Sequence, residues 1–220
     1  MERRVRRMNL KKLVTAAVCT MLMAAVAFTA GCGGEKKSDK KVLKVGMECA
    51  YAPYNWSQTK ADGGAVKIAG SNAYAYGYDV MMAKKLADSM GADLEIQKIE
   101  WDGLAPAVVS GKIDAAIAGM SITSKRKETV DFTKPYYYAT VVALVKKDSE
   151  QAKAQSVAEL KGSVATSQLN TIWYDQIDQV PDVKKLPAID TVPGMIVALT
   201  SGKCNLIVTD IPTAKAAAFA

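Results

Sequence analysis

Three side chains of this sequence carry the groups that would hold a small zwitterion. Arg126 has a planar guanidinium that can bind a carboxylate through two N–H donors. Ser121 offers a hydroxyl and a backbone N–H shortly before a predicted helix start at residues 124–126, where a helix N-terminus favours a negative group. Asp210 has the opposite charge and can accept hydrogen bonds from an ammonium group. Taken by themselves, such residues are more often a helix cap, a surface arginine and a turn or cap aspartate.

The three residues lie in or beside two copies of one sequence pattern. Residues 110–119 (SGKIDAAIAG) are matched by residues 201–210 (SGKCNLIVTD), and each copy follows a helical apolar pattern. Each copy contains a glycine turn and a short apolar run, which is typical of a buried strand in a parallel sheet. Ligands of open α/β sheets bind outside the carboxyl ends of the strands. We therefore expect residues 119–121 and Asp210 to face a cleft shared by two similar α/β lobes.

The elements predicted to position these residues alternate between strand and helix. A strand at 42–46 precedes a loop at 47–76, and Gly77 starts a helix that Gly91 ends. A strand at 94–96 and a helix at 104–109 lead into the first repeat. The run at 139–145 is expected to cross between the lobes as a hinge, and the second lobe continues with a strand at 164–166 and a turn and helix at 189–200.

The N-terminal residues have the pattern of an export signal. A basic segment is followed at residues 13–28 by an apolar run that is too short for a permanent membrane span. Residues 29–32 (TAGC) resemble a bacterial lipobox, in which the cysteine, here Cys32, is lipidated. A plain signal peptide cut near Ala30 and an uncleaved anchor are the alternatives. We predict a signal peptide at 1–31, a polar tether at 32–41, lobe 1 at 42–138, and a hinge strand with lobe 2 at 139–220.

The formal net charge of +7 comes mostly from the predicted signal. Six of the 29 Lys and Arg residues and one of the 22 acidic residues precede Cys32, which leaves 23 minus 21, or +2, for the rest. No basic stripe with interleaved aromatic residues remains to indicate nucleic-acid binding. We therefore expect no nucleic-acid partner.

The composition also narrows the chemistry that the chain can perform. The sequence has no His, which excludes histidine-dependent triads and imidazole zinc sites from this chain. Cys49 and Cys204 lack the paired spacing of a metal knuckle, and the sequence does not decide whether they form a disulfide. Cys204 occupies the place that Ile113 has in the first repeat, so we interpret it as a core thiol. We expect no metal, no cofactor and no catalytic residue.

An ordered set of motifs from Leu43 to about Lys215 resembles the bacterial extracellular solute-binding proteins of family 3, the amino-acid receptors of ABC importers. Each motif is weak alone, and their order is specific. The motifs are VGMECAYAPY at 45–54, GYDV at 77–80, WDGL at 101–104, SGKID at 110–114, AGMSITSKR at 118–126 and VDFTKPYY at 130–137. The resemblance implies a two-lobed periplasmic-binding-protein-like fold of type II, in which each lobe is a mainly parallel sheet flanked by helices.

The resemblance also implies roles for residues around the expected cleft. Arg126 and Ser121 would bind the ligand carboxylate, while Asp210 and the carbonyl of Gly119 would bind its ammonium group. Gln168 and Thr171 would lie on the second-lobe loop that meets the carboxylate or side chain. Many relatives have Gln-Gly-Thr where this chain has residues 168–171 (QLNT), so we expect that the glycine turn is lost.

The ligand side chain is expected among Glu48, Tyr51 and Trp101, with Tyr54 equally suited to ordinary packing. Aromatic faces can enclose aliphatic or cationic groups. Glu48 stands where many relatives have an aspartate facing a basic side chain, which favours a cationic ligand, although an amide could also donate to it. Residues 136–138 (YYY) are expected to belong to the hinge and core.

The predicted function is an amino-acid-binding receptor that delivers a polar or cationic L-amino acid to a membrane permease. We expect a monomer, lipid-anchored on the extracytoplasmic face of the bacterial cell membrane. The alternative is a secreted enzyme, such as a dehydratase, or a sensory domain on the same fold. An enzyme needs an acid or base in the cleft, and Glu48 has no evident catalytic partner. The resemblance further implies a segment returning to lobe 1, which we expect to be missing after residue 220.

Overall fold

The structure, a computed structural model, describes residues 40–219. The predicted signal peptide at 1–31 and the predicted lipidation site Cys32 lie outside the described residues, as does most of the tether at 32–41. Residues 40–220 cluster into one compact unit. Within residues 40–219, no helix combines the length and apolar character that a membrane crossing requires.

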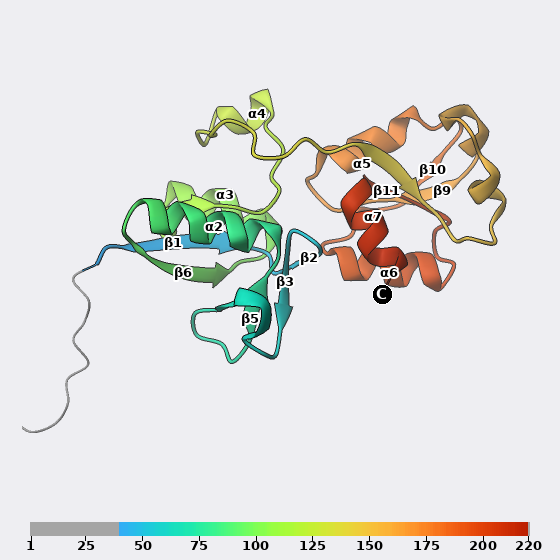
Figure 1. Ribbon diagram of the computed structural model, residues 1–220. Helices are drawn as coiled ribbons and strands as arrows, with labels where there is room; N and C mark the ends of the chain where they lie inside the picture. The colour runs from blue at the N-terminus through green and yellow to red at the C-terminus, as the bar shows by residue number, and fades with distance from the viewer. Residues whose placement is uncertain (1–39, 220) are drawn as a thin grey trace, which may run out of the picture. The chain divides into compact units, whose positions relative to one another are not determined.

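A three-stranded parallel sheet, called here the β1 sheet, forms the first part of the fold (Figure 1). Its central strand β1 (Val42–Met47) lies between β6 (Asp93–Lys98) and β7 (Ala115–Ala116). Helices α2 (Tyr78–Ser89) and α3 (Leu104–Val109) pack on this sheet. Burial of apolar side chains from β1, β6, α2 and α3 stabilises the packing, and those with no exposed surface include Val45, Met47, Val80, Ile96 and Leu104.

The segment expected to be a loop at 47–76 instead forms a small antiparallel sheet, so that prediction was wrong. Its strands β2 (Ala50–Tyr51), β3 (Asn55–Gln58), β5 (Tyr74–Tyr76) and β4 (Val66–Lys67) pair in that order. Each strand has only two to four residues, which is too few to show a period-two pattern in the sequence. These short strands therefore form through pairing with their neighbours in the sheet rather than through a pattern in the local sequence.

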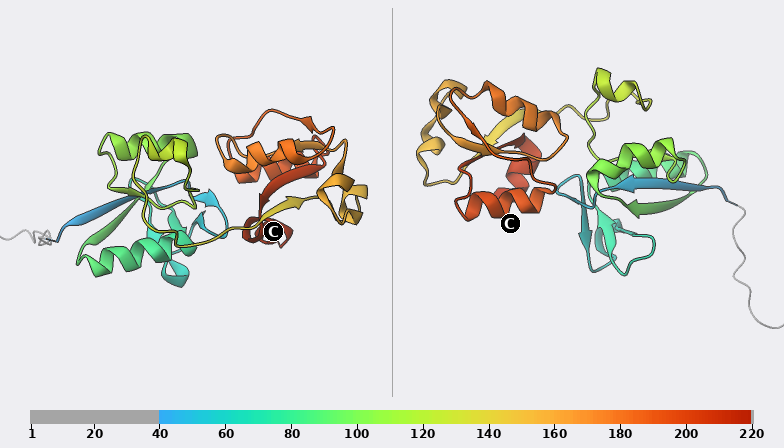
Figure 2. Two further views of the ribbon diagram at one scale, coloured as in Figure 1. Left: turned by 90° about the horizontal axis from the view of Figure 1, so that it is seen from above. Right: turned by 180° about the vertical axis from the view of Figure 1, so that it is seen from behind.

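A second main sheet, called here the β11 sheet, has the order β10-β9-β11-β8. Strands β10 (Lys184–Lys185), β9 (Val164–Thr166) and β11 (Leu206–Asp210) are parallel, and β8 (Val141–Leu144) is antiparallel to β11. Figure 2 shows β8 in yellow beside β11 in red. Helices α5 (Ile172–Gln176), α6 (Val192–Thr200) and α7 (Ile211–Ala218) belong to this part of the chain, and α6 confirms the helix predicted within 189–200.

The remaining elements are short helices on the connections. Helix α4 is at Ser124–Lys127. The 3₁₀ segments are Asp62–Gly64, Trp101–Gly103, Glu150–Lys153, Val157–Leu160 and Ile177–Gln179.

The run at 139–145, expected to be a hinge strand, is a shorter strand that lies in the β11 sheet. Strand β8 pairs with β11 along its whole length, from Val141 opposite Asp210 to Leu144 opposite Ile207. The link from the β1 sheet is therefore made by the irregular residues before Val141. The boundaries of the two lobes at 42–138 and 139–220 stay a prediction.

The two sequence repeats adopt the same local structure, as predicted. In both copies the glycine, Gly111 or Gly202, has a positive φ of 70° or 80°. The residue two positions later, Ile113 or Cys204, is buried, so Cys204 is confirmed as a core thiol. The copies differ in strand length because β7 lies at the edge of its sheet, whereas β11 has a neighbour on each side.

The fifth position of each repeat binds the adjacent strand. The Asp114 carboxylate accepts from the Lys44 N–H at 2.7 Å, and the Asp114 N–H donates to the Lys44 carbonyl at 2.9 Å. Asn205 repeats both bonds with Val164, each at 2.9 Å. The Asp or Asn at this position therefore fixes the register of β7 and β11 at the start of each strand.

A buried carboxylate lies at the start of α2. Asp79 has no exposed surface, and its two oxygens accept from Asn55 Nδ2 at 2.7 Å and from the Tyr136 hydroxyl at 2.8 Å. Desolvation by burial raises the pKa of Asp79 to about 6, although the two hydrogen bonds favour the charged form. Asp79 is therefore an acid held in the core by neutral donors.

Asn205→Ala should lower the free energy of unfolding by about 1–2 kcal/mol, because the Val164 N–H loses a partly buried acceptor. Asp114→Ala should lower the free energy of unfolding by less, since Asp114 is exposed and water can replace its carboxylate as the acceptor for the Lys44 N–H. Urea unfolding of both variants measures this, with Lys203→Ala and Lys112→Ala as exposed controls in the same repeats. Equal stability of Asn205→Ala and Lys203→Ala would contradict the assigned role.

The buried Asp79 should give the protein a distinct pH dependence of stability. Its folded pKa lies above that of an exposed aspartate, about 3.9, so the folded state binds the proton more tightly. The contribution of this tighter proton binding to the free energy of unfolding is fully present below about pH 4 and is lost as the pH rises to about 6. The wild-type free energy of unfolding minus that of Asp79→Asn should therefore fall by about 2–3 kcal/mol over this range and then level off. Urea unfolding from pH 4 to 7 tests this, with Asp88→Asn, at an exposed position of α2, as the control.

Candidate ligand-binding site

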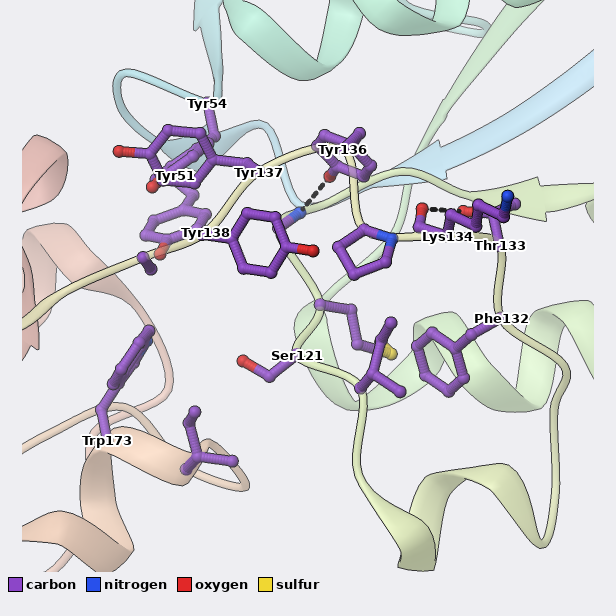
Figure 3. A pocket seen from close by; sticks show the side chains of 16 residues that line it. Tyr51, Tyr54, Ser121, Phe132, Thr133, Lys134, Tyr136, Tyr137, Tyr138 and Trp173 are labelled. Carbon is purple, nitrogen blue, oxygen red and sulfur yellow. Dashed lines mark hydrogen bonds between the residues drawn. The ribbon is translucent and has the colours of Figure 1, made fainter.

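Two adjoining cavities lie at the residues that the sequence selected. The smaller, of about 10 Å³, is lined by seven of the nine predicted ligand-binding residues together with Ile172 and Trp173; the seven are Tyr51, Trp101, Gly119, Ser121, Arg126, Gln168 and Thr171. The larger, of about 260 Å³, shares Tyr51, Gly119 and Ser121 with it (Figure 3). Its size suits one small ligand, since pockets for larger molecules begin near 300 Å³.

Arg126 is placed at the smaller cavity by α4. Its Nη1 donates to the Ser121 carbonyl at 2.7 Å and its Nη2 to the Asn170 carbonyl at 2.8 Å. The guanidinium carbon lies 5.4 Å from the centre of the Trp101 ring, within the range of a cation–π contact. Burial lowers the pKa of Arg126, an effect that the carboxylate of Asp175 opposes. Arginine stays protonated at neutral pH, so the site keeps a positive charge.

The helix cap before Arg126 is Thr123, whose hydroxyl accepts from the Arg126 N–H at 3.2 Å. Ser121 is therefore not the cap. Figure 3 shows the Ser121 hydroxyl directed into the larger cavity. Arg126 and Ser121 consequently present a guanidinium and a hydroxyl to adjoining cavities, as a carboxylate-binding pair would require.

Asp210 lies behind Tyr51 and lines neither cavity. It is fully buried and caps α7, where its Oδ1 accepts from the Thr213 N–H at 2.9 Å and from the Tyr54 hydroxyl at 3.4 Å. The Tyr51 hydroxyl donates to Oδ2. The Tyr51 pKa is raised well above its ordinary value by burial and then by the negative Asp210. The cap interpretation of Asp210 is thus confirmed, and Tyr51 connects its carboxylate to the cavities.

Glu48 is also set behind the cavity wall. Its Oε2 accepts from Gln168 Nε2 at 3.0 Å, and Oε1 has no hydrogen-bond partner among the described residues. Glu48 as a whole is 2% exposed, and burial raises its pKa, while the bond from Gln168 acts in the opposite direction. Gln168 itself lines the smaller cavity. A buried carboxylate with one unsatisfied oxygen favours a cation or an amide donor beside it.

The loop at 168–171 keeps a left-handed turn, which corrects the expectation that the turn is lost. Asn170 has φ of 54°, a conformation that asparagine tolerates better than other residues with a Cβ. Its Nδ2 donates to Asp102 Oδ1 at 2.9 Å. Thr171 caps α5, and its hydroxyl donates to the Gln168 carbonyl at 2.7 Å. The Thr171 hydroxyl is therefore engaged within its own loop.

Gly119 is the one position of the cavity wall where a side chain would not fit. Its φ is 62°, and a Cβ would lie 2.9 Å from Cε1 of Tyr51. The absence of a side chain therefore lets the Tyr51 ring lie against the backbone at the end of the first repeat. Both features require glycine here.

Residues 136–138, which the sequence analysis assigned to the hinge and core, lie on the irregular link before Val141 and also line the larger cavity. Tyr138 is 82% exposed. Tyr54 stacks on Tyr51 with ring centroids 4.8 Å apart and meets the Tyr137 ring edge-on at 5.6 Å. This aromatic wall (Figure 3) can enclose an aliphatic or cationic group.

The sequence analysis missed Asn170, Ile172 and Trp173 as neighbours of the site. Asn170 could have been found, because asparagine is a frequent substitute for glycine at left-handed positions. Trp173 and Ile172 had no such signal. Cys49 and Cys204 are both buried and free, and residues 40–219 contain no cluster of three or more potential metal ligands.

Comparison with known proteins identifies the family. The family model for bacterial extracellular solute-binding proteins, family 3, matches residues 43–186, well over half of the chain. The chain belongs to this family. The match covers the β1 sheet from Leu43, all the residues that line the two cavities, and strands β8, β9 and β10 of the β11 sheet. The family is extracellular or periplasmic, and this member has its periplasmic-binding-protein-like α/β fold.

Individual members of the family are similar over most of this chain. The arginine-binding extracellular protein ArtP of Bacillus subtilis is 31% identical over 164 residues, covering 74% of this chain and 57% of ArtP. ABC transporter arginine-binding protein 1 of Escherichia coli is 29% identical, covering 91% of this chain and 72% of that protein. The amino acid ABC transporter substrate-binding protein AbpA of Streptococcus pneumoniae, solved with L-arginine, gives a TM-score of 0.67 at 28% identity, covering 79% of this chain and 69% of AbpA. The chain thus spans between 57% and 72% of these relatives.

Gly119→Ala should destabilise this family member more than Gly111→Ala. Both glycines have positive φ, so each alanine carries a backbone cost of about 1 kcal/mol. A Cβ at Gly111 meets nothing within 4 Å, whereas one at Gly119 collides with the Tyr51 ring. We expect Gly119→Ala to lower the free energy of unfolding by at least a further 1 kcal/mol, as overpacking does. Urea unfolding of both variants provides the comparison, and equal losses would show that Tyr51 can move aside freely.

Proposed function

We propose that this protein is the amino-acid-binding receptor of an ABC importer and that its ligand is a polar or cationic L-amino acid, with L-arginine the first candidate. The observation that supports the proposal most is the arrangement of Arg126 and Ser121 on cavities that Tyr51 connects to Asp210. A cation that lines the smaller cavity and an anion behind the Tyr51 ring can serve the two ends of a zwitterion once the Tyr51 hydroxyl moves from Asp210. The names of two relatives and the ligand of a solved relative support arginine.

The assignment of individual ligand contacts rests on charge and position. Arg126, with Ser121, binds the carboxylate, and Asp210 together with the Gly119 carbonyl binds the ammonium group after the Tyr51 hydroxyl moves from Asp210. Gln168 and Thr171 complete the wall on the loop from β9. The ligand side chain lies between Tyr51 and Trp101 and reaches Glu48, whose free oxygen gains a partner from a guanidinium or an amide.

Transport follows from closure of two lobes over the ligand. In this proposal lobe 1 comprises residues 42–138, and the hinge strand with lobe 2 comprises 139–220. Hydrogen bonds already join the two segments, among them those from Tyr51 to Asp210, from Gln168 to Glu48, and from Arg126 to Asn170. A ligand that contacts both segments favours the closed form by its differential affinity for that form. The closed form then docks on the membrane permease.

The proposed location is the outer face of the bacterial cell membrane, with the monomeric receptor held there by a lipid on Cys32 and a tether at 32–41. The extracellular or periplasmic location of the family supports this. Intact-mass spectrometry of the membrane fraction tests the anchor. A diacylglyceryl mass on Cys32 that is absent in Cys32→Ala is the expected result, and an unmodified soluble chain would overturn it.

L-Arginine should raise the melting temperature of the chain from Gly33 onward, because a ligand of the native state adds about 2.7 kcal/mol at one hundred times its Kd. Arg126→Ala should abolish the shift, whereas Lys125→Ala, at an exposed neighbouring position, should retain it. Asp210→Asn should also lose binding while remaining folded, since asparagine caps a helix as well as aspartate.

Glu48→Gln tests the cation preference in the same assay. The variant should lose affinity for L-arginine relative to L-glutamine, and Glu100→Gln, an exposed acidic neighbour, serves as control. A folded wild-type protein that no L-amino acid stabilises would contradict the proposed function. Selective stabilisation by a neutral amino acid would contradict only the role of Glu48.

A further inference from the structure

Two turns beside the candidate site have the same left-handed backbone conformation that Asn170 has in the loop at 168–171. Cys49 has φ of 57° and lies between Glu48 and the strand that carries Tyr51. Gly119 has φ of 62° and lies two residues before Ser121. A left-handed conformation at a residue with a Cβ, as at Cys49, persists only when surrounding contacts determine it. The Cys49 turn therefore needs an anchor.

Each turn is held through its backbone N–H by one side chain. The Cys49 N–H donates to Asn55 Oδ1 at 2.7 Å, and the Gly119 N–H donates to the Tyr136 hydroxyl oxygen at 3.0 Å. Asn55 and Tyr136 come from different parts of the chain, β3 and the segment before β8. Local sequence therefore does not link the two anchors.

Both anchors end on one carboxylate. Asn55 Nδ2 donates to Asp79 Oδ2 at 2.7 Å, and the Tyr136 hydroxyl donates to Asp79 Oδ1 at 2.8 Å. Only one orientation of the Asn55 amide is consistent with this, because its oxygen must face the Cys49 N–H and its nitrogen the carboxylate. Asp79 and Asn55 have no exposed surface, so water cannot replace the bond between them. Helix α2 fixes the position of the Asp79 carboxylate in turn. At the start of this helix the Asp79 N–H donates to the Tyr54 carbonyl at 2.8 Å.

We propose that Asp79 is a positioning residue of the binding site, which holds the Cys49 turn through Asn55 and the Gly119 turn through Tyr136. The inference rests on the proposed function for its effect on ligand affinity. Hydrogen bonds in such a chain polarise one another, and an ionised end acceptor strengthens the donors that lead to it. The carboxylate thereby fixes both the Glu48 side and the Ser121 side of the site before a ligand arrives, which lowers the ordering cost of binding.

Tyr136→Phe tests one branch with little change in volume. Hydrogen–deuterium exchange of the Gly119 amide, followed by NMR, should accelerate by about tenfold or more, while the Cys49 amide on the other branch stays unchanged. The Kd for L-arginine should rise about tenfold. The matched control is Tyr174→Phe, which removes a hydroxyl that donates to the Leu186 carbonyl at 2.8 Å in the β11 sheet. Tyr174→Phe should change neither the exchange rate of the Gly119 amide nor the Kd for L-arginine.

The shared carboxylate is tested by combining Tyr136→Phe with Asp79→Asn. Because Tyr136 acts through Asp79, the loss of L-arginine affinity in the double variant should be smaller than the product of the single losses. Losses that multiply would show that the two residues act independently and would overturn the proposal. An unchanged Gly119 exchange rate, or an unchanged Kd, in Tyr136→Phe would also overturn it. If the wild-type protein binds no L-amino acid, the proposed function fails, and the Gly119 exchange rate still decides whether Tyr136 holds this turn.

Discussion

Parallel strand pairing is the constraint on which the site depends. Strand β1 pairs in parallel with β6 and β7, and β11 pairs in parallel with β9, so the carboxyl ends of neighbouring strands meet at one edge of each sheet. Glu48 follows β1, Gly119 and Ser121 follow β7, Gln168 follows β9, and Asp210 ends β11. The repeated Asp114 and Asn205 fix the start of two of these strands and thereby set where each strand ends. The polar residues gather because the sheets bring their strand ends together.

The second constraint is the burial of acidic groups without cations. Glu48, Asp79 and Asp210 are all buried, and the ion pairs found in residues 40–219 involve none of them. Neutral donors reach them instead, from Gln168, Asn55, three tyrosines and one backbone N–H. Asp79 has a donor on each oxygen and serves as an anchor, whereas Glu48 has one oxygen without a described partner. The same type of group thus has both oxygens satisfied in one place and one oxygen without a described partner in another, according to how many donors reach it.

Much of the fold could be predicted from local pattern. The helix between Gly77 and Gly91, the strands of both repeats and the α/β order were visible because apolar spacing and glycine position depend on neighbours in the sequence. The small antiparallel sheet at 50–76 could not be predicted, because strands of two to four residues show no period. Of the candidate site, the sequence predicted seven residues that line the smaller cavity, whereas Asn170 and Trp173 were missed because the motifs of the family mark only Gln168 and Thr171 in this loop.

The sequence by itself determined which residue types stand at the strand ends and that the chain repeats one supersecondary unit, since both are properties of order along the chain. Only the tertiary structure decided how the charges are satisfied. Tyr51 covers Asp210, Gln168 faces Glu48, and Asp79 holds two distant turns. All of these contacts join residues that are 24 to 159 positions apart in the sequence. Such contacts are set by packing of the whole chain, so no local pattern encodes them.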